Sequence, residues 1–256
     1  MDFLNHISGM FAFCLYDSNL GKAYIARDFY GIRPLFYMIK QGRFYFASEI
    51  KSFLDLACFE NKINYESIYH FLSLAYIPGK LTPFKDIQEM ENGHLFEIDV
   101  ARGSFQEREY YKINYIPDYS LCEDSIAAEL HKVLLDSVRR NLISDAPLGL
   151  TLSGGVDTST LLTLIKELGR SQDIHTYSIK MDESSFDESY YQRIMVNFAK
   201  SIHHEIIVKP QDVLDNLISH MAYMDEPSGD GAAIPSFILL RKQVNTCRFF
   251  CPERGG

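Results

Sequence analysis

The chain lacks any apolar run near the ~18 residues that are needed to cross a bilayer. Its opening residues, MDFLNHISGM, lack the basic region and long apolar stretch of a secretory signal. The five cysteines are scattered without a C-x-x-C pair, which argues against structural disulfides or a zinc site. The 25 Lys and Arg residues are outnumbered by 34 Asp and Glu residues. The resulting net charge of −9 argues against a general nucleic-acid binder. We therefore expect a cytoplasmic protein that binds neither membrane nor nucleic acid.

The composition is that of a soluble globular protein with a sizeable core. Apolar residues make up 46% and charged residues 23% of the 256 positions. This length suffices for one large domain or two modest ones. The pattern changes at residues 112–122, so we expect one domain over 1–112 and a second over 123–256.

The first hundred residues predict antiparallel β-structure. Short runs rich in aromatic and β-branched residues, separated by turn residues, lie at 10–16, 22–28, 34–39 and 43–48. Connections this short favour antiparallel neighbours. A brief helix is expected over 64–76 and another strand over 93–100. Cys14 lies within the first run, where we expect a buried and inert thiol.

The second half first shows helical periodicity and then alternates strands with helices. Segment 123–143 places six apolar residues on one helical face: Ile126, Leu130, Val133, Leu134, Val138 and Leu142. Strands are expected at 147–152, 174–179 and 203–208, and a helix is expected after each of them. This alternation predicts a parallel sheet that is covered on both faces.

The segment LTLSGGVDTST, residues 150–160, joins an expected strand to a helix through two glycines. At the carboxyl edge of a parallel sheet, such a turn lets backbone N–H groups and the positive helix end bind an anion. Ser153, Thr158 and Ser159 add hydroxyl donors, and Asp157 suits a Mg²⁺ ion that the phosphates share. The Walker and dinucleotide motifs are both missing. The residues alone leave a phosphate site and an ordinary loop equally open.

The same segment resembles the pyrophosphate-loop motif S-G-G-x-D-[ST]-S of ATP pyrophosphatases. With its flank, SVRRNLISDAPLGLTLSGGVDTS is similar to the corresponding segment of glutamine-dependent asparagine synthetases. ARDFYGIRPLFY and FASEIKSFL resemble that family's glutaminase domain, and YIPGKLTPFKDI its connecting region. YSIKMDESSFDES, HHEIIV and MDEPSGDGAAIPSF resemble its synthetase domain. The similarity runs in the right order across nearly the whole chain.

This resemblance implies a carbon–nitrogen ligase with two sites. An antiparallel β domain of the N-terminal-nucleophile (Ntn) hydrolase type frees ammonia from glutamine. A parallel-sheet α/β domain, similar to adenine nucleotide alpha-hydrolases, uses ATP and Mg²⁺ to form β-aspartyl-AMP, which ammonia converts into asparagine. The residues that the resemblance assigns to nucleotide binding are Thr151, Ser153, Gly154, Gly155, Asp157, Thr158, Ser159 and Ile179, with Asp157 also the metal ligand.

The chain departs from the family pattern at both ends. The resemblance implies that it begins after the nucleophilic cysteine, so we expect no glutaminase activity and assign no catalytic residue. The family's S-G-E-G-G-D-E segment is missing near the other end, and we interpret Cys247 and Cys251 there as incidental. Two alternatives to aspartate amidation stay open: a different carboxylate acceptor, or a non-catalytic fragment. The fragment would act as an assembly partner, in a homo-oligomer or with a complementing chain.

Three other groups of polar residues are interpreted as structural. His203 and His204 are adjacent in an expected strand and point to opposite faces, so they cannot readily share a metal ion. Arg27 and Asp28 are expected to make a structural ion pair or an interdomain contact. The acidic residues of MDEPSGD, residues 224–230, are expected in a solvated loop, and the resemblance leaves a role on the substrate side open.

Overall fold

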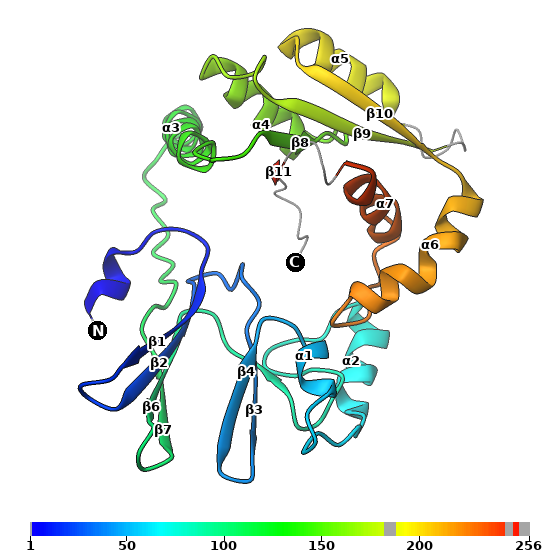
Figure 1. Cartoon of the computed structure of the whole chain (residues 1–256). Coiled ribbons are helices and arrows are strands. Elements are labelled where there is room, and N and C mark those ends of the chain that lie inside the picture. Colours follow the sequence, from blue (N-terminus) through cyan, green and yellow to red (C-terminus); the bar gives the residue numbers. More distant parts are fainter. Residues whose placement is uncertain (1, 182–187, 244–247, 251–256) are drawn as a thin grey trace. The chain divides into compact units, whose positions relative to one another are not determined.

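The computed structural model describes residues 2–181, 188–243 and 248–250 (Figure 1). The chain forms two compact units. Unit 1 comprises residues 1–116 together with 222–230, and unit 2 comprises residues 117–221 together with 231–256. The chain therefore leaves unit 2, contributes nine residues to unit 1, and returns.

Unit 1 contains two antiparallel sheets, as the first half of the sequence predicts (Figure 1). The first sheet has the order β1-β2-β6-β7, with β1 at Ala12–Asp17, β2 at Lys22–Arg27, β6 at His94–Asp99 and β7 at Ser104–Glu109. The second has the order β4-β3-β5, with β4 at Arg43–Ala47, β3 at Phe36–Lys40 and β5 at Gln88–Glu89. Three short helices complete the unit: η1 at Asp2–His6, α1 at Lys51–Leu54 and α2 at Tyr65–Leu74.

An apolar cluster joins the two sheets of unit 1. Ile25 and Phe96 come from the first sheet and Tyr37 from the second, and all three are buried. The rings of Tyr37 and Phe96 meet edge to face, with their centroids 4.9 Å apart. Aromatic pairs of this kind add to the free energy gained by burying apolar area. Inward-facing strand residues thus form this core together with Leu35 and Met90, which lie next to the strands.

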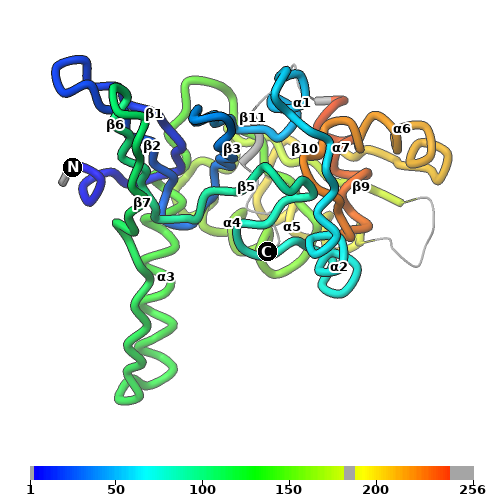
Figure 2. Tube along the Cα trace, turned by 90° about the horizontal axis from the view of Figure 1, so that it is seen from below, coloured from blue at the N-terminus to red at the C-terminus, as the bar shows by residue number. Residues whose placement is uncertain are grey.

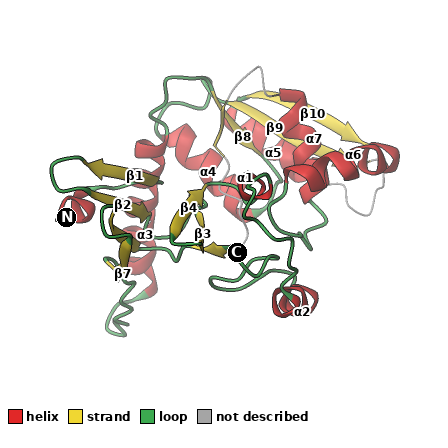
Figure 3. Cartoon of the chain, turned by 60° about the horizontal axis from the view of Figure 1, so that its bottom comes forward, coloured by secondary structure: helices red, strands yellow, loops and turns green. Residues whose placement is uncertain are grey.

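Unit 2 is built on a parallel sheet with the strand order β10-β9-β8-β11, of which Figure 3 labels β8, β9 and β10. Its strands are β8 at Leu148–Thr151, β9 at His175–Met181, β10 at Ile202–Val208 and β11 at Arg248–Phe250. The helices are α3 at Glu123–Asn141, α4 at Val156–Glu167, α5 at Ser189–Ala199, α6 at Pro210–Tyr223 and α7 at Ala233–Gln243. The last two residues of α6 belong to unit 1.

Helices cover both faces of the parallel sheet, which confirms the sequence prediction. Leu150 of β8 is buried with Leu162 and Ile165 of α4 on one face. On the other face, Tyr177 of β9 is buried with Ile238 of α7. None of the described helices is long and apolar enough to span a membrane.

The predicted burial of Cys14 is wrong, and the apolar face of segment 123–143 is buried only in part. The tube in Figure 2 shows α3 as one uninterrupted helix, but Ile126, Leu130 and Val133 are 47%, 54% and 59% exposed. Its carboxyl-terminal half contributes to the core, through the buried Val138 and Leu142 and the partly buried Leu134 and Leu135. Cys14 lies in β1 as expected, yet it is exposed, since β1 is an edge strand of its sheet. The pair Cys247 and Cys251 lies outside the described residues.

Candidate functional site

The glycine turn, by which we mean residues 153–159, lies at the carboxyl end of an inner strand of the parallel sheet. Strand β8 has β9 on one side and β11 on the other, and it ends at Thr151. Helix α4 begins at Val156, with Gly155 as its N-cap. In open α/β sheets, ligands bind beyond the carboxyl ends of the strands, and an inner strand places its loop among those of its neighbours.

The structure brings the expected nucleotide-binding residues to this one edge. Thr151 ends β8, Ser153 to Gly155 form the connection, and Asp157 to Ser159 lie in the first turn of α4. Thr151 pairs in register with Tyr177 on β9, two residues before Ile179. The eight residues thus come from two adjacent strand ends and one helix start, and their nucleotide-binding role stays a prediction.

The turn presents several backbone N–H groups that have no acceptor. The Gly155 N–H donates to the Ser153 Oγ at 3.2 Å. Within the described part of the chain, the N–H groups of residues 156–158 have no hydrogen-bond acceptor. Such groups at a helix start carry partial positive charge and attract an anion. The turn therefore has the polarity of a phosphate-binding site.

Asp157 fits the expected role of a magnesium ligand by its chemistry. Its carboxylate is exposed in the first turn of α4, beside the free N–H groups. Mg²⁺ commonly binds proteins through one or two carboxylates while it keeps waters and phosphate oxygens as its other ligands. A single exposed carboxylate would therefore suffice for a metal ion that arrives with phosphates, and the metal-ligand role of Asp157 stays a prediction.

Thr158 is turned away from solvent and supports the turn from within. The residue is 1% exposed, and its Oγ1 lies 3.1 Å from the Ser153 Oγ. It also donates to the Gly155 carbonyl at 3.4 Å. Of the three expected hydroxyl donors, Thr158 therefore lies in the interior, while Ser153 and Ser159 are partly exposed.

Gly154 has a backbone conformation that requires glycine. Its φ is +86°, a region that side chains rarely adopt. An added Cβ would lie 2.9 Å from the Cβ of Tyr191 and 3.2 Å from the backbone nitrogen of Gln192. The turn thus packs directly against the start of α5.

Gln192 contacts the turn from beneath, which sequence reasoning missed. Its side chain is 2% exposed, and its Nε2 lies 3.4 Å from the carbonyl oxygens of both Ser153 and Ile179. Its Oε1 is buried and has no partner within the described residues. A lone glutamine on a helix distant in sequence carries no motif signal, so only the packing of α5 reveals it.

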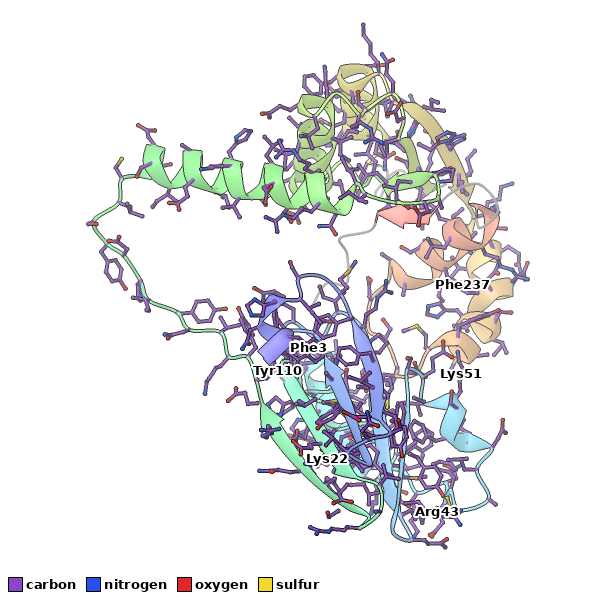
Figure 4. All side chains as sticks on the ribbon, turned by 60° about the vertical axis from the view of Figure 1, so that its left-hand side comes forward. Phe3, Lys22, Arg43, Lys51, Tyr110 and Phe237 are labelled. Carbon is purple, nitrogen blue, oxygen red and sulfur yellow. The ribbon has the colours of Figure 1, made fainter. Side chains whose placement is uncertain are left out.

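The other polar residues singled out in the sequence have structural contacts. His203 lies 3.1 Å from the Thr176 hydroxyl, whereas His204 stacks on Tyr177, so the two imidazoles do face opposite sides. Arg27 makes an ion pair with Glu89 at 2.5 Å. The Arg27 carbonyl accepts from the hydroxyl of Tyr110, which Figure 4 labels, at 2.5 Å. These contacts support the structural interpretation.

Asp28 organises a turn of unit 1 through its carboxylate. The residue is buried, and its two oxygens accept four backbone N–H groups at 2.9 to 3.2 Å. The donors are Phe11, Tyr30, Ile32 and Arg33. Asp28 therefore satisfies the backbone of two separate segments, and within the described residues Arg27 pairs with Glu89 instead of Asp28.

A second cluster, formed by Glu91, His94 and Glu107, offers ligand atoms within 4.8 Å of one another. The ammonium group of Lys80 already lies 3.1 Å from Glu91 and 3.0 Å from Glu107. A lysine between two carboxylates neutralises them without a metal ion. We interpret this cluster as an ion-pair network of unit 1.

The acidic segment after α6 is solvated only in part: Asp230 is exposed, as expected, whereas Asp225 and Glu226 are half-buried in unit 1. The Ile50 N–H donates to the Asp225 Oδ1 at 2.6 Å, and the Lys51 Nζ lies 3.4 Å from the Tyr223 carbonyl. The Glu226 Oε1 is buried and has no hydrogen-bond partner among the described residues. Burial, with smaller effects from Glu89 and Asp225, raises the pKa of Glu226 to about 7.

This pKa predicts that Glu226 makes the protein less stable as the pH rises. The folded value of about 7 lies above the ordinary value of 4.5, so the folded state binds more protons between these two limits. The contribution of Glu226 is complete below about pH 4.5 and is lost as the pH rises through 7. Because Glu226 is partly exposed, screening reduces the change to about 1–2 kcal/mol.

Replacing Glu226 with glutamine removes this dependence, so the variant gains stability over the wild type as the pH rises. Chemical denaturation at pH 5, 6, 7 and 8 measures the difference. The same substitution at Glu129, which is exposed, serves as the control and is expected to leave the pH dependence unchanged. Parallel stability curves for wild type and Glu226→Gln would show that the carboxyl titrates normally.

Comparisons with known proteins match two families along the chain. Residues 129–246 match the asparagine synthase family, and residues 1–111 match the glutamine amidotransferase domain family. The chain is 30% identical over 240 residues to putative glutamine-hydrolyzing asparagine synthetase 2 of Methanocaldococcus jannaschii, covering 92% of this chain and 46% of that protein. It is also 30% identical over 236 residues to asparagine synthetase 1 of Bacillus subtilis, covering 92% of this chain and 37% of that protein.

The chain thus spans less than half the length of these two relatives. Among solved structures, NMN synthetase from Francisella tularensis aligns with a TM-score of 0.33 and 16% sequence identity. That alignment covers 50% of this chain and 53% of the other.

Proposed function

We infer the function from the family: the chain belongs to the glutamine-hydrolysing asparagine synthetases, and we propose that it takes part in ATP-dependent amidation of aspartate. In this proposal, residues 1–112 belong to the glutaminase domain and its connection. Residues 123–256 belong to the ATP-pyrophosphatase domain. ATP and Mg²⁺ bind at the glycine turn between β8 and α4.

The observation that carries the proposal is the set of free N–H groups at residues 156–158 beside the exposed carboxylate of Asp157. These groups lie where an inner strand meets a helix, so the helix dipole adds to their attraction for a triphosphate. Bound Mg²⁺ would neutralise part of the charge on the phosphate oxygens. Asp157 would hold that metal ion, and Ser153 and Ser159 would donate hydrogen bonds to the phosphates.

The proposed chemistry needs a leaving group that the turn can stabilise. A carboxylate oxygen of aspartate attacks the α-phosphorus of ATP, and the bond to the β-phosphate oxygen breaks to release pyrophosphate. Ammonia then attacks the activated carbonyl carbon, and AMP leaves. Donors fixed before the reaction lower the barrier because they need no reorganisation as charge develops on the pyrophosphate. The residues of the turn thereby assist the first of the two steps.

Isotope exchange between ATP and pyrophosphate, measured with the purified chain, tests the proposal. We expect exchange that depends on both Mg²⁺ and aspartate, because adenylation is reversible while ammonia is withheld. Exchange driven by another carboxylate would instead support an amidotransferase with a different acceptor. Absence of exchange together with absence of Mg·ATP binding by calorimetry would support a non-catalytic assembly partner and reject the enzyme.

A further inference from the structure

The backbone carbonyls at the ends of β8 and β9 are capped from inside unit 2. The Ser178 hydroxyl donates to the Leu152 carbonyl at 2.7 Å. Gln192 Nε2 lies 3.4 Å from the carbonyls of Ser153 and Ile179. Carbonyl oxygens carry partial negative charge and would repel a bound anion. Each of these three carbonyls thus has a side-chain donor from unit 2.

The contact with Ser153 also fixes the direction of the next N–H group. In a planar trans peptide, the carbonyl of one residue and the N–H of the next point in opposite directions. When the Ser153 carbonyl is directed toward Gln192, the Gly154 N–H is directed to the opposite side. This N–H has no acceptor among the described residues. Glycine can adopt either orientation of such a peptide, so a contact on the Ser153 carbonyl favours the observed one.

The amide of Gln192 carries an energetic cost that an apolar side chain would not have. Its buried Oε1 has no partner, and a buried polar atom without a hydrogen bond is destabilising. An apolar side chain of similar length would fill the same space without that cost. The Nε2 contacts with Ser153 and Ile179 are what such a side chain would lose.

We propose that Gln192 is a positioning residue of the glycine turn. It locks the Ser153–Gly154 peptide with its carbonyl inward, so that the Gly154 N–H joins those of residues 156–158 in binding the pyrophosphate part of ATP. This role rests on the proposed function of the turn, although the locked peptide itself is a property of the ligand-free chain.

Replacing Gln192 with methionine separates positioning from stability. Methionine keeps the length and removes both the donor and the unpaired oxygen, so the melting temperature is expected to stay the same or rise. Mg·ATP affinity, measured by calorimetry, is expected to fall about tenfold through the loss of two hydrogen bonds. Amide hydrogen exchange in residues 150–160 of the ligand-free variant is expected to become faster. The matched control is Gln211→Met on α6, which removes an exposed glutamine and should change none of these.

A second variant supplies a signature that a purely structural residue would lack. In Gln192→Glu, a charged carboxylate faces two carbonyl oxygens, so at pH 8 the affinity should fall below that of Gln192→Met. When the carboxyl is protonated at lower pH, it can donate to one carbonyl, and the affinity relative to wild type at the same pH should recover.

Each result bears on one of the two proposals. If the wild-type chain fails to bind Mg·ATP, the proposed function is rejected. Amide hydrogen exchange of the ligand-free chain still decides whether Gln192 holds the Ser153–Gly154 peptide. If Gln192→Met binds Mg·ATP as the wild type does, or if its exchange over 150–160 is unchanged, the positioning role is overturned. The positioning role is supported if Gln192→Met shows faster amide hydrogen exchange over residues 150–160 and weaker Mg·ATP binding than the wild type.

Discussion

Replacing Asp157 with alanine is expected to weaken Mg·ATP binding by about 100-fold or more, because the metal loses its expected protein ligand. Titration calorimetry in the presence of magnesium measures the loss. In EDTA, which removes the metal ion, the substitution should no longer weaken phosphate binding. Without metal, the Asp157 carboxylate repels the phosphates, so the alanine variant should bind free pyrophosphate at least as well as the wild type does.

The matched control for this substitution is Asp124→Ala. Asp124 is the second residue of α3, as Asp157 is the second residue of α4, and both are exposed. Each alanine removes the favourable interaction of an acid with a helix start, about 0.3–1 kcal/mol. The two variants should therefore lose similar stability, while only Asp157→Ala loses Mg·ATP affinity. Unchanged affinity in Asp157→Ala would reject the metal-ligand role.

Replacing Asp28 with alanine is expected to destabilise unit 1 by about 3–5 kcal/mol. Four backbone N–H groups would lose their acceptor at a buried position, and each unsatisfied group is destabilising. Hydrogen exchange of peptides covering residues 22–40 reports on this unit directly. We expect exchange there to accelerate far more than in the helices of unit 2.

Two comparisons make the Asp28 result specific. Asp28→Asn keeps one acceptor oxygen but turns an NH₂ group toward backbone donors, so its loss should be intermediate. Asp55→Ala removes an exposed acid after α1 and should change the stability by less than about 0.5 kcal/mol. If Asp28→Ala were as stable as Asp55→Ala, the four hydrogen bonds would contribute nothing to the fold.

The local sequence pattern predicted where strands and helices lie better than it predicted which of their side chains are buried. Strands β2 and β9 and helix α4 follow from alternation, periodicity and turn residues, and each lies close to its expected position. Segment SFQERE, residues 104–109, is too polar for a strand to be predicted there, yet it forms β7 and pairs with β6. The exposure of Ile126 and Cys14 likewise depends on which neighbours are present, which a single segment does not encode.

For the candidate site, the motif predicted the residues on one short segment and missed those that act from elsewhere. Ser153 to Ser159 are contiguous, so the glycine spacing and the helix start are legible in the sequence. Gln192 reaches the turn only through the packing of α5 against β9 and α4. The docking of Asp225 on Ile50 joins positions far apart in the chain, and no local pattern anticipates it.

The nine residues 222–230 give unit 1 a discontinuous sequence. During synthesis, residues 1–116 leave the ribosome well before this piece exists. The Ile50 N–H meets its acceptor, Asp225, only after most of unit 2 has been translated. Unit 1 therefore remains incomplete until residues 222–230 have been synthesised. Because both units are discontinuous, cleavage of the chain at a single point releases neither of them intact.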